Sequence, residues 1–125
     1  MSEKILLVED DADLHLGLAL RLRSRGFEVL SALSAREVLP IAMTQQPHLI
    51  LLDIGLPDED GHAVASALGD YEETRGIPIV YLTARHETSH RIRAESLRAS
   101  AYLVKPCRPE RLFDVIEGVL DARRR

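Results

Sequence analysis

Leu49-Ile50-Leu51-Leu52-Asp53 is the segment that decides the fold, because four consecutive apolar residues end in an acidic one. A strand with one face in water alternates apolar and polar residues, whereas a strand covered by helices on both faces is apolar throughout. The run therefore predicts a central strand of a parallel sheet. A second run with the same pattern, Ile5-Leu6-Leu7-Val8, ends in Glu9 and Asp10.

Short apolar segments alternate with helix-length amphipathic segments along the whole chain. The predicted strands are Lys4–Val8, Phe27–Ser31, Leu49–Leu52, Ile77–Leu82 and Ala101–Val104. The predicted helices are Asp11–Arg25, one that begins at Ser34, one from Asp60 or Gly61 to about Thr74, His86–Ser100, and one that begins at Pro109. Strict alternation favours right-handed crossovers and a doubly wound α/β fold. We expect a five-stranded parallel sheet in the flavodoxin-like order 2-1-3-4-5.

Several residues mark where the predicted helices begin and end. Asp11 is a candidate N-cap for the first helix, and Gly26 is its stop signal. Ser34 and Glu37 have the spacing of a capping box for the second helix. Pro40 lies too deep in that helix to be accommodated easily, so we expect an irregularity there.

Length and composition predict one domain, residues 1–125, with 121–125 as a frayed tail or the start of a linker. The single cysteine, Cys107, cannot form an internal disulfide, which suits a reducing compartment. No apolar run approaches the roughly 20 residues of a membrane span, so we expect a cytoplasmic protein without membrane contact. The net charge of −4 argues against direct binding of nucleic acid by this domain.

Polar residues follow four of the five predicted strands. They are Glu9 and Asp10 after the first strand, Asp53 after the third, Thr83 after the fourth and Lys105 after the fifth. Taken singly, an acidic residue here is often a helix cap, a threonine a turn residue and a lysine a solvated charge. In a doubly wound sheet, however, the carboxyl ends of the strands form one rim, and ligands bind where the strand order reverses. The combination therefore predicts a single reactive site.

Three carboxylates in one place indicate a hard divalent cation such as Mg²⁺, which prefers oxygen ligands. Without a cation, each close pair of carboxylates repels by ~4 kcal/mol at an effective dielectric constant near 20. A lysine and a hydroxyl at the same rim suit a phosphoryl group, because both can donate hydrogen bonds to its oxygens. Asp53 would then be the nucleophile that forms an aspartyl phosphate.

Four motifs occur in order at these strand ends: Leu7-Val8-Glu9-Asp10-Asp11, Leu51-Leu52-Asp53-Ile54-Gly55-Leu56-Pro57 followed by Gly61, Leu82-Thr83-Ala84, and Tyr102-Leu103-Val104-Lys105-Pro106. With these motifs the chain resembles a response regulator receiver domain, of the chemotaxis-regulator type, over essentially its whole length. The resemblance implies two-component signalling, in which a histidine kinase or a histidine phosphotransfer domain supplies a phosphoryl group to Asp53. Such a domain is a switch and not an enzyme in the usual sense, because it catalyses only its own phosphorylation and dephosphorylation.

The resemblance also implies a set of metal ligands. They are Glu9, Asp10, Asp53 and the backbone carbonyl of Gly55, and the ion is Mg²⁺, which Mn²⁺ can replace. Asp10 is expected to bind the ion directly and Glu9 largely through water. Thr83 and Lys105 are expected to contact the phosphoryl group bound to Asp53.

A second set of residues is expected to transmit the signal. Thr83 and the aromatic Tyr102 form a switch pair, in which Tyr102 moves inward when Thr83 moves. The small Ala84 keeps the approach to the site open, and the Lys105-Pro106 peptide bond is expected to be cis. The output surface is expected to comprise the helix at 86–100, the fifth strand and the last helix. The effector is not implied, and a phosphorylation-dependent homodimer is compatible with the resemblance.

Two other functional classes compete with this interpretation. An aspartyl phosphatase would share the chemistry, but that class typically has a second acid two residues after the nucleophile, where this chain has Gly55. A pseudo-receiver would keep the fold as an interaction module and lack phosphorylation, although all five site positions are filled here. Gly55 also replaces the bulkier or polar residue that receiver domains often carry, which predicts a short-lived phosphorylated form.

Overall fold

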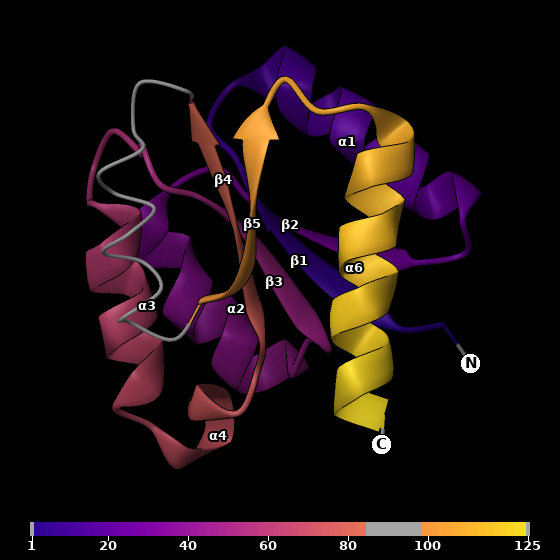
Figure 1. The fold of residues 1–125 in the computed structure, drawn as a ribbon. Coiled ribbons are helices and arrows are strands. Elements are labelled where there is room, and N and C mark those ends of the chain that lie inside the picture. Colours follow the sequence, from indigo (N-terminus) through magenta and orange to yellow (C-terminus); the bar gives the residue numbers. More distant parts are fainter. Residues whose placement is uncertain (1, 85–98, 125) are drawn as a thin grey trace.

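A parallel sheet of five strands forms the centre of the computed structural model, which describes residues 2–84 and 99–124 (Figure 1). The strands are β1 (Lys4–Val8), β2 (Glu28–Ala32), β3 (Leu49–Asp53), β4 (Ile79–Ala84) and β5 (Ala99–Lys105). Their order in the sheet is β2-β1-β3-β4-β5, and every neighbouring pair is parallel. The predicted fold class and strand order are therefore confirmed.

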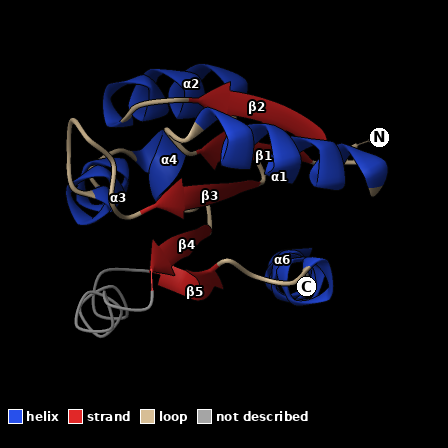
Figure 2. Ribbon diagram, turned by 90° about the horizontal axis from the view of Figure 1, so that it is seen from above, coloured by secondary structure: helices blue, strands red, loops and turns tan. Residues whose placement is uncertain are grey.

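Helices cover both faces of this sheet, as Figure 2 shows. On one face lie α1 (Ala12–Ser24) and α6 (Pro109–Arg124), and on the other lie α2 (Val38–Gln45), α3 (Gly61–Gly69) and the short α4 (Glu72–Arg75). A 3₁₀ turn, η1 (Ala35–Glu37), precedes α2. No helix among residues 2–84 and 99–124 combines the length and the apolar character that a membrane crossing needs.

The core has two layers because the central strands are buried on both faces. In β1, Leu6 and Val8 belong to the layer under α2 and α3, whereas Ile5 and Leu7 belong to the layer under α1 and α6. All five residues of β3 are buried. The continuous apolar runs in the sequence reflect this two-sided burial.

The ends of α1 form as the sequence predicts. The Asp11 side chain caps the helix by accepting hydrogen bonds from the N–H groups of Asp13 and Leu14, each at 3.1 Å. Gly26 has a φ of 87°, a left-handed conformation that glycine adopts without strain, and it follows the C-cap residue Arg25. Pro109 occupies the first position of α6, also as predicted.

Two predictions for the middle of the chain are wrong. The helix expected to run to about Thr74 ends at Gly69, and α4 begins as a separate element. The Thr74 hydroxyl donates to the Leu68 carbonyl at 2.6 Å, which satisfies a helix-end acceptor of α3 and links α4 to it. The capping box at Ser34 does not form, because the Ser34 hydroxyl donates to the Glu37 carboxylate instead of accepting from the backbone.

The irregularity predicted at Pro40 lies before it: the segment starts as the 3₁₀ turn η1 and is α-helical from Val38, which places Pro40 in the first turn of α2, where proline is tolerated. The helix predicted at 86–100 lies outside the described residues except for its last two residues. Those two, Ala99 and Ser100, belong to β5, so this part of the prediction is wrong. The register shifts between Ile79 and Val80, so Ala99 pairs with Ile79, Ala101 pairs with Val80, and Ser100 is the extra residue between them.

The C-terminal end of α6 is attached to the rest of the domain. Residues 121–124, which we expected to fray or to start a linker, form the last turn of this helix. Arg123 donates to the Gly76 carbonyl at 3.1 Å. Arg124 forms ion pairs with Glu3, near the start of the chain, and with Asp121.

Candidate functional site

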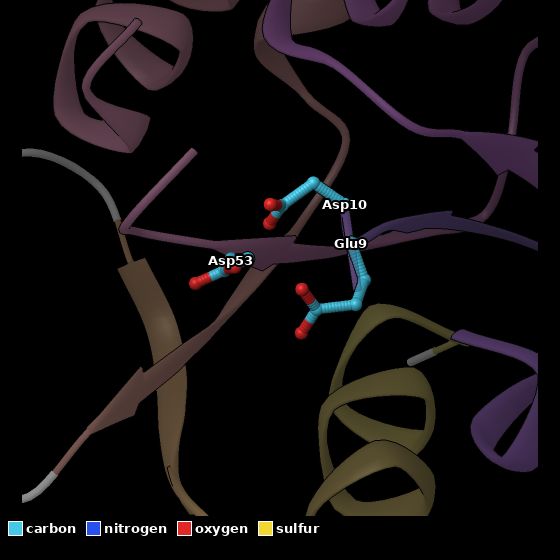
Figure 3. Close-up of side chains that lie close together, drawn as sticks. All are labelled: Glu9, Asp10 and Asp53. Atoms are coloured by element: carbon cyan, nitrogen blue, oxygen red, sulfur yellow. The ribbon is translucent and has the colours of Figure 1, made fainter. Parts of the chain in front are cut away.

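The register of the sheet places the acidic residues of two strands side by side. Val8 of β1 pairs with Leu52 of β3, so the residues that follow them, Glu9 and Asp53, are neighbours at the carboxyl rim. Asp10 follows Glu9 directly and lies at the same rim. Figure 3 shows the carboxylates of these three residues turned toward a common space. Each offers an oxygen, and these oxygens lie within 4.8 Å of one another.

Burial differs among the three carboxylates in a way that matters for their charge. Glu9 is 1% exposed and Asp53 is 3% exposed, whereas Asp10 is open to solvent. Two buried carboxylates beside each other are unfavourable unless a cation or a proton neutralises part of the charge. The donor set, three carboxylate groups, suits a hard divalent cation such as Mg²⁺.

Lys105 supplies one positive charge to this site. It is the last residue of β5, and it pairs in register with Ala84 at the end of β4. Its Nζ atom lies 3.2 Å from Glu9 Oε1 and 3.4 Å from Asp53 Oδ1. The lysine therefore bridges the two buried carboxylates from the opposite end of the sequence. The peptide bond that follows it, to Pro106, is cis, the isomer that the family resemblance implied.

The pKa values show that one cation does not fully balance the two acids. Burial, a hydrogen bond with Asp53 and the charge of Asp53 together raise the pKa of Glu9 from 4.5 to about 7. Burial disfavours the charged form of Lys105, but the Asp53 and Glu9 carboxylates outweigh it and raise the pKa of Lys105. Glu9 is consequently the group at which excess negative charge is relieved by a proton.

Backbone N–H groups fix the orientation of both buried carboxylates. The N–H group of Gly55 donates to Asp53 Oδ1 at 3.0 Å, and the N–H group of Asp11 donates to Glu9 Oε2 at 3.2 Å. The sequence predicted a role for the Gly55 carbonyl, and the contact seen in the structure uses its N–H group.

Gly61 holds the loop after Asp53 in place by allowing a close approach of two backbone segments. Its N–H group donates to the Ile54 carbonyl at 3.0 Å. A Cβ atom at Gly61 would lie 2.8 Å from Ile54 Cα and 3.0 Å from the Asp53 carbonyl oxygen. Any larger residue would displace the backbone at the candidate nucleophile.

The remaining predicted site residues lie on β4 and β5. Thr83 is buried, and it pairs in register with Val104. Tyr102 is partly buried and packs against the core layer under α2 and α3. Ala84 is the last residue of β4. The strand ends named from the sequence thus converge on one rim, while the switching roles of Thr83 and Tyr102 and the access role of Ala84 stay predictions.

The comparisons with known proteins agree with this geometry. A family model described as "Response regulator receiver domain" matches residues 5–117. The chain belongs to this family.

Two curated relatives of the receiver domain are named as regulators. The receiver domain is 37% identical over 118 residues to the probable transcriptional regulator ycf27 of Porphyridium aerugineum. The alignment covers 94% of this chain and 48% of the relative. The receiver domain is 33% identical over 120 residues to the phosphate regulon transcriptional regulatory protein PhoB of Pseudomonas aeruginosa, with coverage of 96% and 52%. The receiver domain thus spans about half the length of these curated relatives.

Solved structures resemble the receiver domain over nearly its whole length. A putative response regulator from Chloroflexus aurantiacus has a TM-score of 0.92 and 30% identity, and the match covers 97% of this chain and 99% of that one. The receiver domain of the sensor histidine kinase PA1611 from Pseudomonas aeruginosa has a TM-score of 0.89 and 27% identity, with coverage of 97% and 99%. That structure has a magnesium ion coordinated in its active-site cleft.

Two side chains of this receiver domain make contacts that were not predicted from its sequence, one to η1 and one to Glu9. Asp58 caps η1 from a distance, by accepting hydrogen bonds from the N–H groups of Ala35 at 2.9 Å and Arg36 at 3.2 Å. The hydrogen bond from Ala35 lowers the pKa of Asp58 below its usual value. His15 is buried beside Glu9. Its only sequence signal is a polar residue one turn after Asp11 in a helix rich in leucine.

Proposed function

We propose that this receiver domain is a phosphorylation-activated switch that accepts a phosphoryl group on Asp53 in a Mg²⁺-dependent reaction. The observation that carries the proposal is the arrangement at the rim: three carboxylates with oxygens within 4.8 Å, and a lysine Nζ 3.4 Å from Asp53 Oδ1. A purely structural cluster would gain nothing from burying two acids beside a single lysine, because the desolvation of the charges is costly.

Glu9, Asp10 and Asp53 would hold the Mg²⁺ ion, together with the Gly55 carbonyl, and Mn²⁺ would serve in its place. The ion supplies positive charge that both cancels the carboxylate repulsion and stabilises the phosphoryl oxygens in the transition state. Glu9 then gives up the proton that its raised pKa retains near neutral pH. Binding of the ion is therefore coupled to deprotonation.

Asp53 is the nucleophile in the transfer. A carboxylate oxygen of Asp53 forms a bond to phosphorus while the bond from phosphorus to the donor's histidine nitrogen breaks, and that nitrogen keeps the electron pair. Lys105 already lies beside Asp53 and can pair with a phosphoryl oxygen after the transfer. Thr83, from the neighbouring strand, provides a hydroxyl donor for a second oxygen.

The phosphoryl group would act by shifting a conformational equilibrium. The new phosphoryl oxygens accept hydrogen bonds better in the state with Thr83 and Tyr102 turned inward. That state therefore becomes more populated. The surface that changes comprises β5, α6 and the segment 86–98, which lies outside the described residues. The domain would act in the cytoplasm, where a histidine kinase or a histidine phosphotransfer domain is the phosphodonor, and the phosphorylated form can pair with a second copy.

Incubation with acetyl phosphate and Mg²⁺, followed by intact-mass measurement, tests this function. We expect one phosphoryl adduct that requires the metal and is absent from the Asp53→Asn variant. Asp70→Asn is the matched control, because Asp70 is an exposed aspartate at the end of α3, and it should keep the adduct. A wild-type protein that stays unmodified with Mg²⁺ and the phosphodonor would favour a pseudo-receiver that acts by binding alone.

A further inference from the structure

His15 is a buried polar residue that the proposed chemistry does not use. It lies in the second turn of α1 and is 8% exposed. Nδ1 of its ring lies 2.9 Å from the Glu9 carbonyl oxygen, and Nε2 lies 2.9 Å from the Ser31 hydroxyl oxygen. The ring therefore connects α1 to the residue after β1 and to β2.

The chemistry of these partners fixes the tautomer of the ring. A carbonyl oxygen can only accept a hydrogen bond, so Nδ1 must carry the hydrogen that is directed at Glu9. In the neutral ring, Nε2 is then an acceptor, and the Ser31 hydroxyl donates to it. Ser31 therefore orients the ring, and the ring in turn holds the Glu9 carbonyl.

Glu9 is held at both of its backbone polar groups. Its N–H group donates to the Ala32 carbonyl at 3.2 Å, so β2 fixes one side of the residue and His15 fixes the other. The direction of the Glu9 side chain follows from this backbone, because the buried carboxylate has little freedom beyond it. A shift of the Glu9 carbonyl would move the carboxylate away from Asp53 and Lys105.

We propose that His15 is a positioning residue, which holds Glu9 in the geometry that the divalent ion requires and does so through the Glu9 carbonyl. This inference rests on the proposed Mg²⁺-dependent function and adds a residue outside the set of metal ligands. Groups that orient a metal's ligands commonly affect metal affinity when they are removed, although they do not touch the ion.

Two amide variants separate the two hydrogen bonds of His15. The side-chain nitrogen of asparagine can reach the position of Nδ1, so His15→Asn keeps a donor for the Glu9 carbonyl. The side-chain amide of glutamine reaches the position of Nε2, so His15→Gln contacts Ser31 and leaves the Glu9 carbonyl without this donor. Glutamine is the better helix former of the two. A merely structural role for His15 therefore predicts that the glutamine variant is the less perturbed one.

The experiment is a calorimetric titration of each variant with MgCl₂, paired with urea unfolding in the absence of metal. We expect His15→Gln to weaken Mg²⁺ binding by ~10-fold and His15→Asn to stay within ~2-fold of wild type. Ser31→Ala removes one hydroxyl at an exposed strand position and should weaken Mg²⁺ binding by ~2-fold to 3-fold. This variant tests the inference even if a His15 variant does not fold.

The outcomes distinguish this inference from the proposed function. Equal Mg²⁺ affinity in all three variants, or losses that simply follow the unfolding free energy, would overturn the role of His15 and leave the proposed function intact. A wild-type protein that binds no Mg²⁺ would overturn both. A loss confined to His15→Gln and Ser31→Ala, with His15→Asn close to wild type, supports the positioning role.

Discussion

Replacing Glu9 by glutamine should make the metal-free protein less sensitive to pH. The folded state raises the pKa of Glu9 from 4.5 to about 7, so between these values the folded protein binds a proton that the unfolded chain does not. The carboxyl therefore contributes to stability below its unfolded pKa, and the contribution is lost as pH rises through the folded pKa. The glutamine variant cannot titrate at this position and lacks this dependence.

The size of the effect follows from the same two pKa values. The pKa shift from 4.5 to about 7, at about 1.4 kcal/mol for each unit, sets an upper limit of ~3–4 kcal/mol on the change in unfolding free energy. Salt and relaxation of the site will reduce it. At about pH 8 without metal, we expect Glu9→Gln to be more stable than wild type, and at about pH 4.5 the difference should shrink toward zero.

Urea unfolding followed by circular dichroism, in EDTA and across this pH range, measures the difference directly. Glu59→Gln is the matched control, because Glu59 is an exposed glutamate and should leave the pH profile unchanged. Excess MgCl₂ should stabilise wild type most at high pH, where Glu9 is ionised, and should stabilise the Glu9→Gln variant less. Parallel pH profiles for wild type and Glu9→Gln would refute the assignment of the raised pKa to this carboxyl.

Three further substitutions or measurements test other parts of the site. Gly61→Ala should destabilise the protein by ~1–3 kcal/mol in urea unfolding, because the alanine Cβ would lie 2.8 Å from Ile54 Cα. Gly118→Ala is the control: Gly118 has open space around it in α6, so this variant should be more stable than wild type by up to ~1 kcal/mol. Equal effects of the two substitutions would contradict the close approach at Gly61. Asp58→Asn should be less stable than wild type at neutral pH, because folding lowers the pKa of Asp58. The stabilisation by this carboxylate is present above its unfolded pKa and is lost as pH falls through its folded pKa. A difference in unfolding free energy that persists in acid would contradict the charged cap. The phosphorylated form should decay quickly after the phosphodonor is removed, because Gly55 has no side chain and we expect it to leave the path of the hydrolytic water open. Intact-mass measurements that give a half-life of hours would be inconsistent with this.

The sequence predicted those features that depend on strand burial and on sheet topology. Continuous apolar runs identified the central strands, because only two-sided burial produces them. Once the strand order was known, the residues that follow each strand had to meet at one rim, so Glu9, Asp53 and Lys105 could be placed together without any knowledge of their contacts.

The features that the sequence did not predict depend on contacts between distant segments. Asp58 caps a turn 22 and 23 residues earlier in the chain, and no local pattern marks such a pair. His15 becomes significant only when the Glu9 carbonyl and Ser31 are seen on either side of its ring. The extension of β5 back to Ala99 likewise depends on a contact with a distant segment, the pairing of Ala99 with Ile79 of β4, which overrides the predicted helix there.

The ion pairs of Arg124 have a consequence for any polypeptide that continues beyond it. In Figure 1 the C-terminus lies near the amino ends of the strands, opposite the carboxyl ends that carry the acidic residues. Helix α6, with 16 residues and a length of ~24 Å, spans the distance between these two ends of the sheet. A following domain would therefore start remote from Asp53 and tethered through Glu3. On the function proposed above, it would respond to the phosphoryl group through α6 and β5, without touching the group itself.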